Sequence, residues 1–216
     1  MKVLLITPAC HFKNAGAAQR DTYSTVSALQ KIGCEVSLFT INSPSQDSAA
    51  LNKISREYNI QVNKFNPTNH LASRLKRTLM APALFDGAAY VFAELAEDKN
   101  FLDYLNDFKP DCIFSFCSYS WPILRLAQKM KIRSIFRSHN FESSFFWESL
   151  NSKEKINTLN WLRAVAKYFG ERNAIKYCDA VGTLPFEQIK KYRGWKQKNV
   201  NILTLTFLPE SLRPPR

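Results

Sequence analysis

The sequence predicts an α/β fold with a doubly wound, mainly parallel sheet of about seven strands and helices on both faces. Short apolar runs alternate with segments of helical periodicity along most of the 216 residues. Strands that alternate with helices form right-handed βαβ units, and such units build a parallel sheet. Hydrophobic residues make up 45% of the chain, which is enough for a buried core. No apolar run reaches the length, about 18 residues, that a membrane-spanning helix requires.

The sequence pattern of residues 2–65 predicts three strands and two helices. After the opening apolar run, apolar side chains recur near a period of 3.6 from Ala17 to Ile32, which indicates a helix. Gly33 is expected to end this helix, because glycine adopts a left-handed backbone at little cost. A polar loop that contains Ser and Pro follows the second strand. In chain order the elements are strand 2–7, helix 16–32, strand 35–40, helix 47–58 and strand 60–65.

The remainder of the chain repeats this alternation. Residues 70–106 are mostly helical with breaks near Pro82 and Gly87, and Pro122 suits the first turn of a helix. Residues 153–177 predict one long amphipathic helix, with Ile156, Leu159, Leu162, Ala166 and Phe169 on its apolar face. The other elements are strand 111–116, helix 120–131, strand 133–137, strand 180–183, helix 186–192 and strand 200–205. We expect one domain over 1–205 and an irregular tail over 206–216.

Composition narrows the classes of function. The net charge of +12 and the pI near 9.6 favour anionic partners, such as phosphorylated substrates or acidic lipid. The basic residues are scattered and no RRM, KH or helix-turn-helix signature occurs, so we expect no nucleic-acid partner. Five cysteines without a CxxC pair argue against a disulfide framework or a metal site, and Cys112, Cys117 and Cys178 are predicted to be buried. The N-terminus lacks the features of a signal peptide, which favours a cytoplasmic protein.

Two loops are expected at one edge of the sheet. Gly16 opens the first helix after strand 2–7, and His139, Asn140 and Glu142 follow strand 133–137. The carboxyl ends of parallel strands line one edge, and ligands bind there. A helix N-terminus binds anions, so a phosphorylated or sugar ligand suits this pair of loops. A purely structural turn at Gly16 and a structural His139 are equally consistent with the residues. Neither G-x-G-x-x-G nor a P-loop occurs, so we expect no nucleotide cofactor.

Two further clusters have a functional and a structural interpretation. Arg74, Lys76 and Arg77 alternate with leucines, which is typical of a helix on an anionic membrane surface and also of a solvated helix face. The second cluster is aromatic and consists of Phe141, Phe145, Phe146 and Trp147. It either lines a sugar or lipid site or packs in the core. Glu171 and Arg172 predict an exposed pair of little energetic consequence.

These segments together resemble the N-terminal domain of a family 4 glycosyltransferase of GT-B fold. The run Lys2-Val3-Leu4-Leu5-Ile6-Thr7-Pro8 is similar to the family's first strand, and Gly16-Ala17-Ala18-Gln19-Arg20 resembles its Gly-Gly-Ala-Glu-Arg turn. Residues 29–36 resemble its Leu-x-x-x-Gly-His-Glu-Val segment. Arg137-Ser138-His139-Asn140-Phe141-Glu142 resembles its His-Asn-x-Glu segment, and residues 171–183 resemble a Glu-bearing helix followed by Ala-Asp-Ala-Val. The order and spacing of these motifs cover residues 1 to about 205.

The resemblance implies a Rossmann-like fold and a role for each matched residue. It implies sugar transfer from a nucleotide sugar to a sugar or lipid-linked acceptor in bacterial polysaccharide or glycolipid synthesis, without a metal or cofactor. His139 would be catalytic. Gly16, Ala17 and Asn140 would contact the donor phosphate or sugar. Gln19, Arg20 and Glu142 would shape the acceptor side. Arg74, Lys76 and Arg77 would hold the domain on the inner face of the membrane.

The chain also departs from the family pattern. Ala17 replaces the second glycine of the turn, Gln19 the usual glutamate, and Cys34 the histidine before Glu35. The family's donor-binding C-terminal domain, with its basic pair and Glu-x7-Glu segment, has no counterpart here. We therefore expect a domain that is incomplete alone, or one that partners a separate donor-binding chain. A non-catalytic module that binds an acceptor or a membrane remains the alternative.

Overall fold

A computed structural model describes residues 1–8, 17–42, 48–67, 81–138, 141–183, 192, 195 and 201–204. Within these residues a parallel sheet has the strand order β3-β2-β1-β4-β5-β6-β7. Every adjacent pair is parallel, with registers such as Leu4 opposite Ser37 and Ile113. The α/β, doubly wound fold class is thereby confirmed. The strands are β1 (Lys2–Thr7), β2 (Glu35–Ile41), β3 (Gln61–Phe65), β4 (Cys112–Ser115), β5 (Arg133–Ser138), β6 (Ala180–Thr183) and β7 (Asn201–Thr204).

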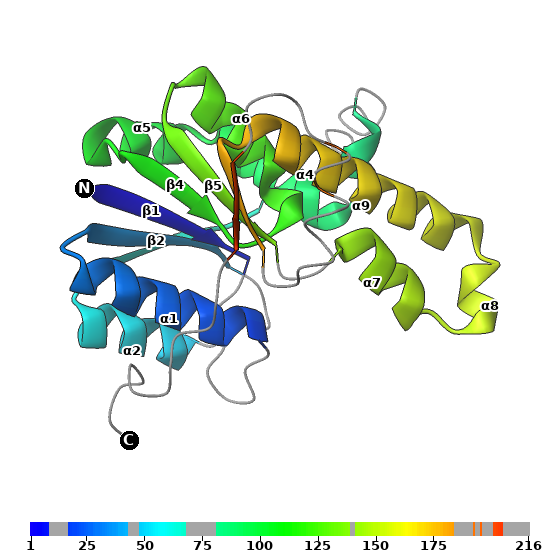
Figure 1. Cartoon of the computed structure of the whole chain (residues 1–216), viewed down its shortest axis with the longest axis horizontal. Coiled ribbons are helices and arrows are strands. Elements are labelled where there is room, and N and C mark those ends of the chain that lie inside the picture. The colour runs from blue at the N-terminus through cyan, green and yellow to red at the C-terminus, as the bar shows by residue number, and fades with distance from the viewer. Residues whose placement is uncertain are drawn as a thin grey trace.

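Helices cover both faces of the sheet (Figure 1). One face of β1 packs Val3 and Leu5 against α1 and α2, and the other packs Leu4 and Ile6 against α4, α5 and α6. This division follows from the strand itself, because successive side chains point to opposite faces. The helices are α1 (Ala17–Lys31), α2 (Ser48–Tyr58), α4 (Gly87–Glu97), α5 (Lys99–Phe108), α6 (Trp121–Lys129), α7 (Glu142–Ser149), α8 (Ser152–Lys155) and α9 (Thr158–Tyr177). Two 3-10 turns are η1 (Pro82–Phe85) and η2 (Ser118–Ser120).

The local signals in the sequence act as expected at several boundaries. Gly33 follows α1 with φ +79°, the left-handed conformation that glycine adopts without strain. Pro82 begins η1, and the Asp86 carboxylate accepts a hydrogen bond from the Ala88 amide at the start of α4. Such a cap satisfies one of the amides that a helix N-terminus leaves unpaired. Pro122 lies in the first turn of α6.

The predicted single helix 153–177 is wrong, because the structure has two helices here. Asn157 interrupts the segment: its side chain accepts a hydrogen bond from the Leu159 amide at 2.9 Å and begins α9. Asn151 begins α8 in the same way and forms a capping box with Glu154. An asparagine that caps a helix offers the backbone an alternative to a continuous helix. Both starts therefore follow from side chains that bind free amides.

The predicted apolar face of this segment does not pack in the core as a whole. Ala166 is buried, whereas Ile156, Leu159 and Phe169 are exposed. The second half of α9 instead buries a different set of residues against η1, η2 and α6, and this set is Ala166, Gly170, Glu171, Ala174 and Ile175. Among the described residues, no helix combines the length and apolar character needed to cross a membrane.

Candidate functional site

The topology places a switch point between β1 and β4. From β1 the chain adds β2 and β3 on one side and then returns to add β4 to β7 on the other. At such a point the loops after the two central strands diverge and leave a crevice at their carboxyl ends, where open α/β sheets bind ligands. Strand β5 is separated from β1 by β4 alone, so the carboxyl ends of β1 and β5 lie about 10 Å apart. Most of the two loops lies outside the described residues, so their meeting at one edge stays a prediction.

The structure describes the predicted site residues only in part. Ala17, Gln19 and Arg20 lie in the first turn of α1, and Glu142 is the first residue of α7. The first turn of α1 carries no acidic residue, so its partial positive charge is not opposed by a carboxylate there. Six further predicted residues lie outside the described residues, and they are Gly16, Arg74, Lys76, Arg77, His139 and Asn140.

The residues on either side of His139 and Asn140 are both anchored. Ser138 is buried at the end of β5, and its hydroxyl hydrogen-bonds the Tyr192 hydroxyl. Phe141 packs against the Tyr192 ring, with centroids 4.8 Å apart, and against Trp195. Burial raises the pKa of Tyr192, so its hydroxyl stays protonated and able to donate. One buried tyrosine therefore holds the chain before and after the His139-Asn140 pair.

Glu142 lies half-buried beside one cation and one further carboxylate. Burial raises the pKa of the Glu142 carboxyl, and the negative charge of Asp86 acts in the same direction. The nearby Lys167 ammonium opposes both effects and favours the carboxylate. A carboxyl group in such surroundings can accept a hydrogen bond from a substrate hydroxyl or act as a proton acceptor.

Glu171 is a candidate site residue whose environment differs from the one expected from the sequence. The predicted exposed pair is wrong, since Glu171 is fully buried and only Arg172 is exposed. Its Oε2 accepts a hydrogen bond from the Ser143 hydroxyl at 2.7 Å, in the first turn of α7. Burial raises the pKa of Glu171 to about 7, against the opposing effect of the Ser143 hydroxyl and the nearby amides of Glu142 and Ser143. Its Oε1 is buried and makes no hydrogen bond within the part of the chain that the structure describes.

Helical spacing indicates the face of the helix on which Glu171 lies, although it does not reveal what covers that face. One face of the helix carries residues 171, 174 and 175, which lie one, four and five positions after residue 170. Three of these four residues are small or apolar, and the fourth is Glu171. A carboxylate within such a stripe faces the protein interior, whereas Arg172 lies outside it. In the structure this side chain reaches Ser143 in the first turn of α7, next to Glu142.

An ion pair connects the same region to α4. Lys167 of α9 contacts Asp86 with a 3.0 Å distance between Nζ and Oδ2, and both side chains are mostly buried. The Lys167 ammonium also lies 5.6 Å from the Phe146 ring centroid and 5.9 Å from that of Tyr119. Because the removal of either partner would leave a buried charge unpaired, this pair fixes α9 against the start of α4.

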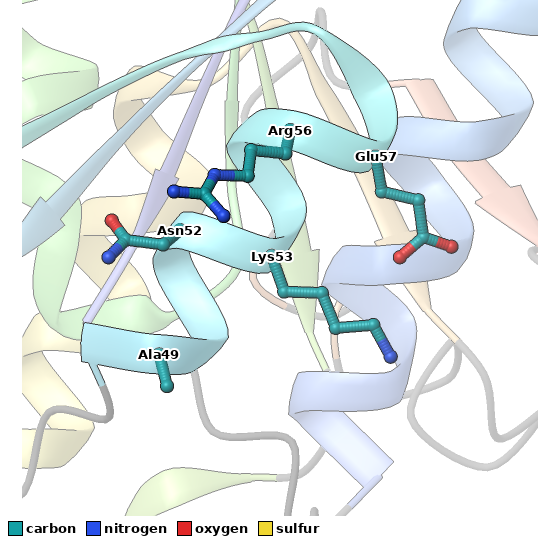
Figure 2. Close-up of a pocket in the computed structure, with 5 residues that line it drawn as sticks. All are labelled: Ala49, Asn52, Lys53, Arg56 and Glu57. Carbon is teal, nitrogen blue, oxygen red and sulfur yellow. The ribbon is translucent and has the colours of Figure 1, made fainter.

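Two hollows lie away from this edge. A hollow of about 550 Å³ beside α2 is lined by exposed side chains of that helix, shown in Figure 2: Ala49, Asn52, Lys53, Arg56 and Glu57. Another, of about 690 Å³, lies at the amino ends of β4, β5 and β6. There the Asp179 carboxylate is already engaged by the Ser134 amide at 2.7 Å. Neither hollow contains a residue that the sequence analysis assigned to the site.

Solved structures with this fold are GT-B glycosyltransferases. Sucrose-phosphate synthase from Thermosynechococcus elongatus is 15% identical, with a TM-score of 0.56 over 94% of this chain and 47% of its own. UGT89C1 from Arabidopsis thaliana, complexed with UDP-L-rhamnose, is 16% identical, with a TM-score of 0.53 over 98% of this chain and 54% of its own. A UDP-glucosyltransferase from Polygonum tinctorium is 11% identical, with a TM-score of 0.51 over 98% of this chain and 55% of its own.

These likenesses establish the fold and leave the activity open. No protein-family model matches the chain. No curated protein matches it either. The chain spans about half the length of the glycosyltransferases that it resembles. The chain therefore shares its fold with about half of each of these three glycosyltransferases.

Proposed function

We propose that this chain is the N-terminal, acceptor-side domain of a family 4 GT-B glycosyltransferase. The proposal rests mainly on the position of Glu142, the first residue of α7 after β5, in a fold shared with glycosyltransferases. The neighbouring residue Ser143 donates a hydrogen bond to the buried Glu171 carboxyl. The matched motifs of residues 1 to about 205 support the narrower family. A donor-binding half, attached or separate, completes the site.

In this proposal the loop after β1 and the loop after β5 both contact the nucleotide-sugar donor. Gly16 and the first turn of α1, which begins at Ala17, offer backbone amides and a positive helix end to the donor diphosphate. His139 contacts the donor sugar and is the catalytic residue, and Asn140 contacts the donor phosphate or sugar. Fixed helix dipoles and cations stabilise the leaving diphosphate without a metal, and the anomeric configuration is retained. Ala17, in place of the family's glycine, adds a Cβ where the backbone approaches phosphate.

The acceptor side is assigned to three residues. Gln19, Arg20 and Glu142 bind the hydroxyl groups of a sugar or lipid-linked sugar, in bacterial polysaccharide or glycolipid synthesis. The half-buried Glu142 is the best supported of the three, because its surroundings perturb its carboxyl group. Arg74, Lys76 and Arg77 bring a cytoplasmic protein to the inner membrane face.

Binding measurements test the proposal on the chain as it stands. We expect the folded chain to bind UDP-, GDP- and ADP-sugars no better than millimolar in calorimetric titration, and to bind saccharide or polyprenyl-linked saccharide ligands on an array. Glu142→Gln and His139→Ala are each expected to weaken array binding, whereas the matched control Glu148→Gln, at an exposed glutamate of α7, is not. Micromolar binding of a nucleotide sugar would assign the donor site to this half. Loss of every saccharide signal in a chain with a native circular dichroism spectrum would refute the acceptor-side role.

We keep one alternative function, because the chain spans only about half the length of sucrose-phosphate synthase and UGT89C1. The chain would then be a non-catalytic module that binds an acceptor or membrane. Transfer assays with a donor-binding domain supplied in trans distinguish the two: product formation that depends on His139 supports the enzyme, and binding without product supports the module.

A further inference from the structure

Helices α7 and α8 and the start of α9 form an arm that extends away from the sheet (Figure 1). We define the arm as residues 142–163 and its tip as residues 151–163. No residue of the tip is buried. Helix α7 lies against α9, and the ordered caps of α8 and α9 fix the turn between them. The tip is therefore a defined structure that is surrounded by solvent.

The tip exposes large apolar side chains. Ile156 is 84% exposed, Leu159 and Trp161 are each 54% exposed, and Leu162 is 38% exposed. Phe145 of α7, on the same arm, is 61% exposed. Single exposed apolar residues are common on protein surfaces, but a group of large ones within a few residues marks an interaction site.

Exposed side chains lie on all sides of the start of α9 and are not restricted to one stripe along the helix. Residues 158–163 extend over more than one and a half turns of α9, and each of them is exposed or half-buried. A partner helix or a flat protein surface covers one stripe of a helix, at spacings of three and four residues. A medium that can enclose a protruding tip from several sides accommodates this arrangement better, and the interface of a lipid bilayer is such a medium.

The tip carries a net positive charge, which favours a membrane with anionic lipids. Lys153, Lys155 and Arg163 are exposed beside the apolar residues. The Glu154 carboxylate accepts a hydrogen bond from the Asn151 amide in the capping box, and it is the tip's acidic residue. Exposed tryptophan near lysine and arginine is typical of segments that lie at a membrane–water interface. The chain's net charge of +12 acts in the same direction.

We propose that the tip of this arm inserts Ile156, Leu159, Trp161 and Leu162 into the interface of an anionic membrane. Lys153, Lys155 and Arg163 then contact acidic headgroups. These residues are different from Arg74, Lys76 and Arg77, which lie outside the described residues, and the inference goes beyond the proposed sugar transfer. It is tested with vesicles that contain no saccharide, so its failure and the failure of the proposed function are distinguishable.

Vesicle partitioning provides the main test. We expect the purified chain to co-sediment with vesicles of phosphatidylcholine and phosphatidylglycerol, and much less with phosphatidylcholine alone. The double variant Leu159→Ser, Trp161→Ser removes two exposed apolar side chains, and the partition coefficient is expected to fall at least about tenfold. Ile32→Ser is the matched control, because Ile32 is 72% exposed after α1 and outside the arm. All of these side chains are exposed, so each variant is expected to keep the native circular dichroism spectrum.

Two further measurements separate the membrane from other partners. Reversal of Lys153 and Lys155 to Glu is expected to lower partitioning at least about fivefold at low salt, with a smaller effect at high salt. Brominated lipids are expected to quench the wild type more than Trp161→Phe, which would place this indole at the bilayer. Unchanged partitioning of the double variant, or no binding by the wild type, would overturn the proposal. It would also be overturned if sedimentation velocity showed a dimer that the double variant dissociates, since the tip would then bind a second copy.

Discussion

Replacement of Glu171 by Gln tests whether this buried side chain is a carboxyl that stays protonated in the folded chain to a higher pH than in the unfolded chain. Glu171 is fully buried, and its Oε2 accepts a hydrogen bond from Ser143 at 2.7 Å. Gln is nearly isosteric, keeps an acceptor for Ser143 and cannot ionise. The substitution therefore removes the titration of the side chain and leaves its packing almost unchanged.

The expected magnitude follows from the shifted pKa. Burial raises the pKa of Glu171 from 4.5 to about 7 in the folded chain, with the neighbouring Glu142 acting in the same direction. Such a rise corresponds to roughly 3 kcal/mol, at about 1.4 kcal/mol for each pH unit. The folded chain holds its proton up to a higher pH than the unfolded chain does. This stability is therefore fully present below pH 4.5 and is lost as the pH rises through about 7.

Urea denaturation at pH 4.5, 6 and 8 measures the effect as a difference between variant and wild type. We expect the free energy of unfolding of Glu171→Gln, relative to wild type, to rise by roughly 3 kcal/mol from pH 4.5 to pH 8. Groups that titrate alike in both chains cancel in this difference. Glu148→Gln, an exposed glutamate of α7, is the matched control and is expected to show little pH dependence. A difference for Glu171→Gln that stays constant with pH would refute the assignment of Glu171 as a buried carboxyl that is neutral at low pH.

Three further predictions concern the supports of the site and the fold. Lys167→Met leaves the mostly buried Asp86 carboxylate unpaired, so urea denaturation is expected to show a loss of about 3–5 kcal/mol, part of which Asp86→Asn restores in the double variant. Tyr192→Phe removes the hydrogen bond to Ser138 and is expected to cost about 1 kcal/mol; an unchanged stability would show that this bond does not hold the end of β5. Gly33→Ala places a Cβ at φ +79° in open space, so its expected cost of about 1 kcal/mol is conformational, and thermal unfolding should show Gly33→Asn to be less affected.

The strands of this fold could be predicted closely from the sequence. Strands buried on both faces require near-continuous apolar runs, and such runs end where the chain leaves the core. The run 2–7 and the run 180–183 match β1 and β6 residue for residue. Gly33 and Pro82 mark boundaries because their backbone preferences are local, and they act whatever the rest of the chain does.

The surroundings of the helices could not be predicted in the same way. The apolar spacing of 153–177 indicated a helix with one apolar face, but spacing does not reveal what covers that face. In the structure Asn157 divides the segment, and Leu159 and Leu162 of the expected face lie in solvent. The clustering of Phe141 and Phe145 likewise gave no way to distinguish packing from exposure, and the structure packs the first and exposes the second.

The sequence by itself determined the order of strands and helices, the ends of many of them and the edge at which Glu142 lies, because these depend on local propensity and on the geometry of parallel βαβ units. Only the tertiary structure decided that Glu171 is a buried carboxyl beside Ser143 and that the tip of the arm is exposed. The physical reason is that burial and the pKa shifts it causes depend on neighbours far apart in the chain, 28 residues apart for Glu171 and Ser143, and a linear pattern does not record them.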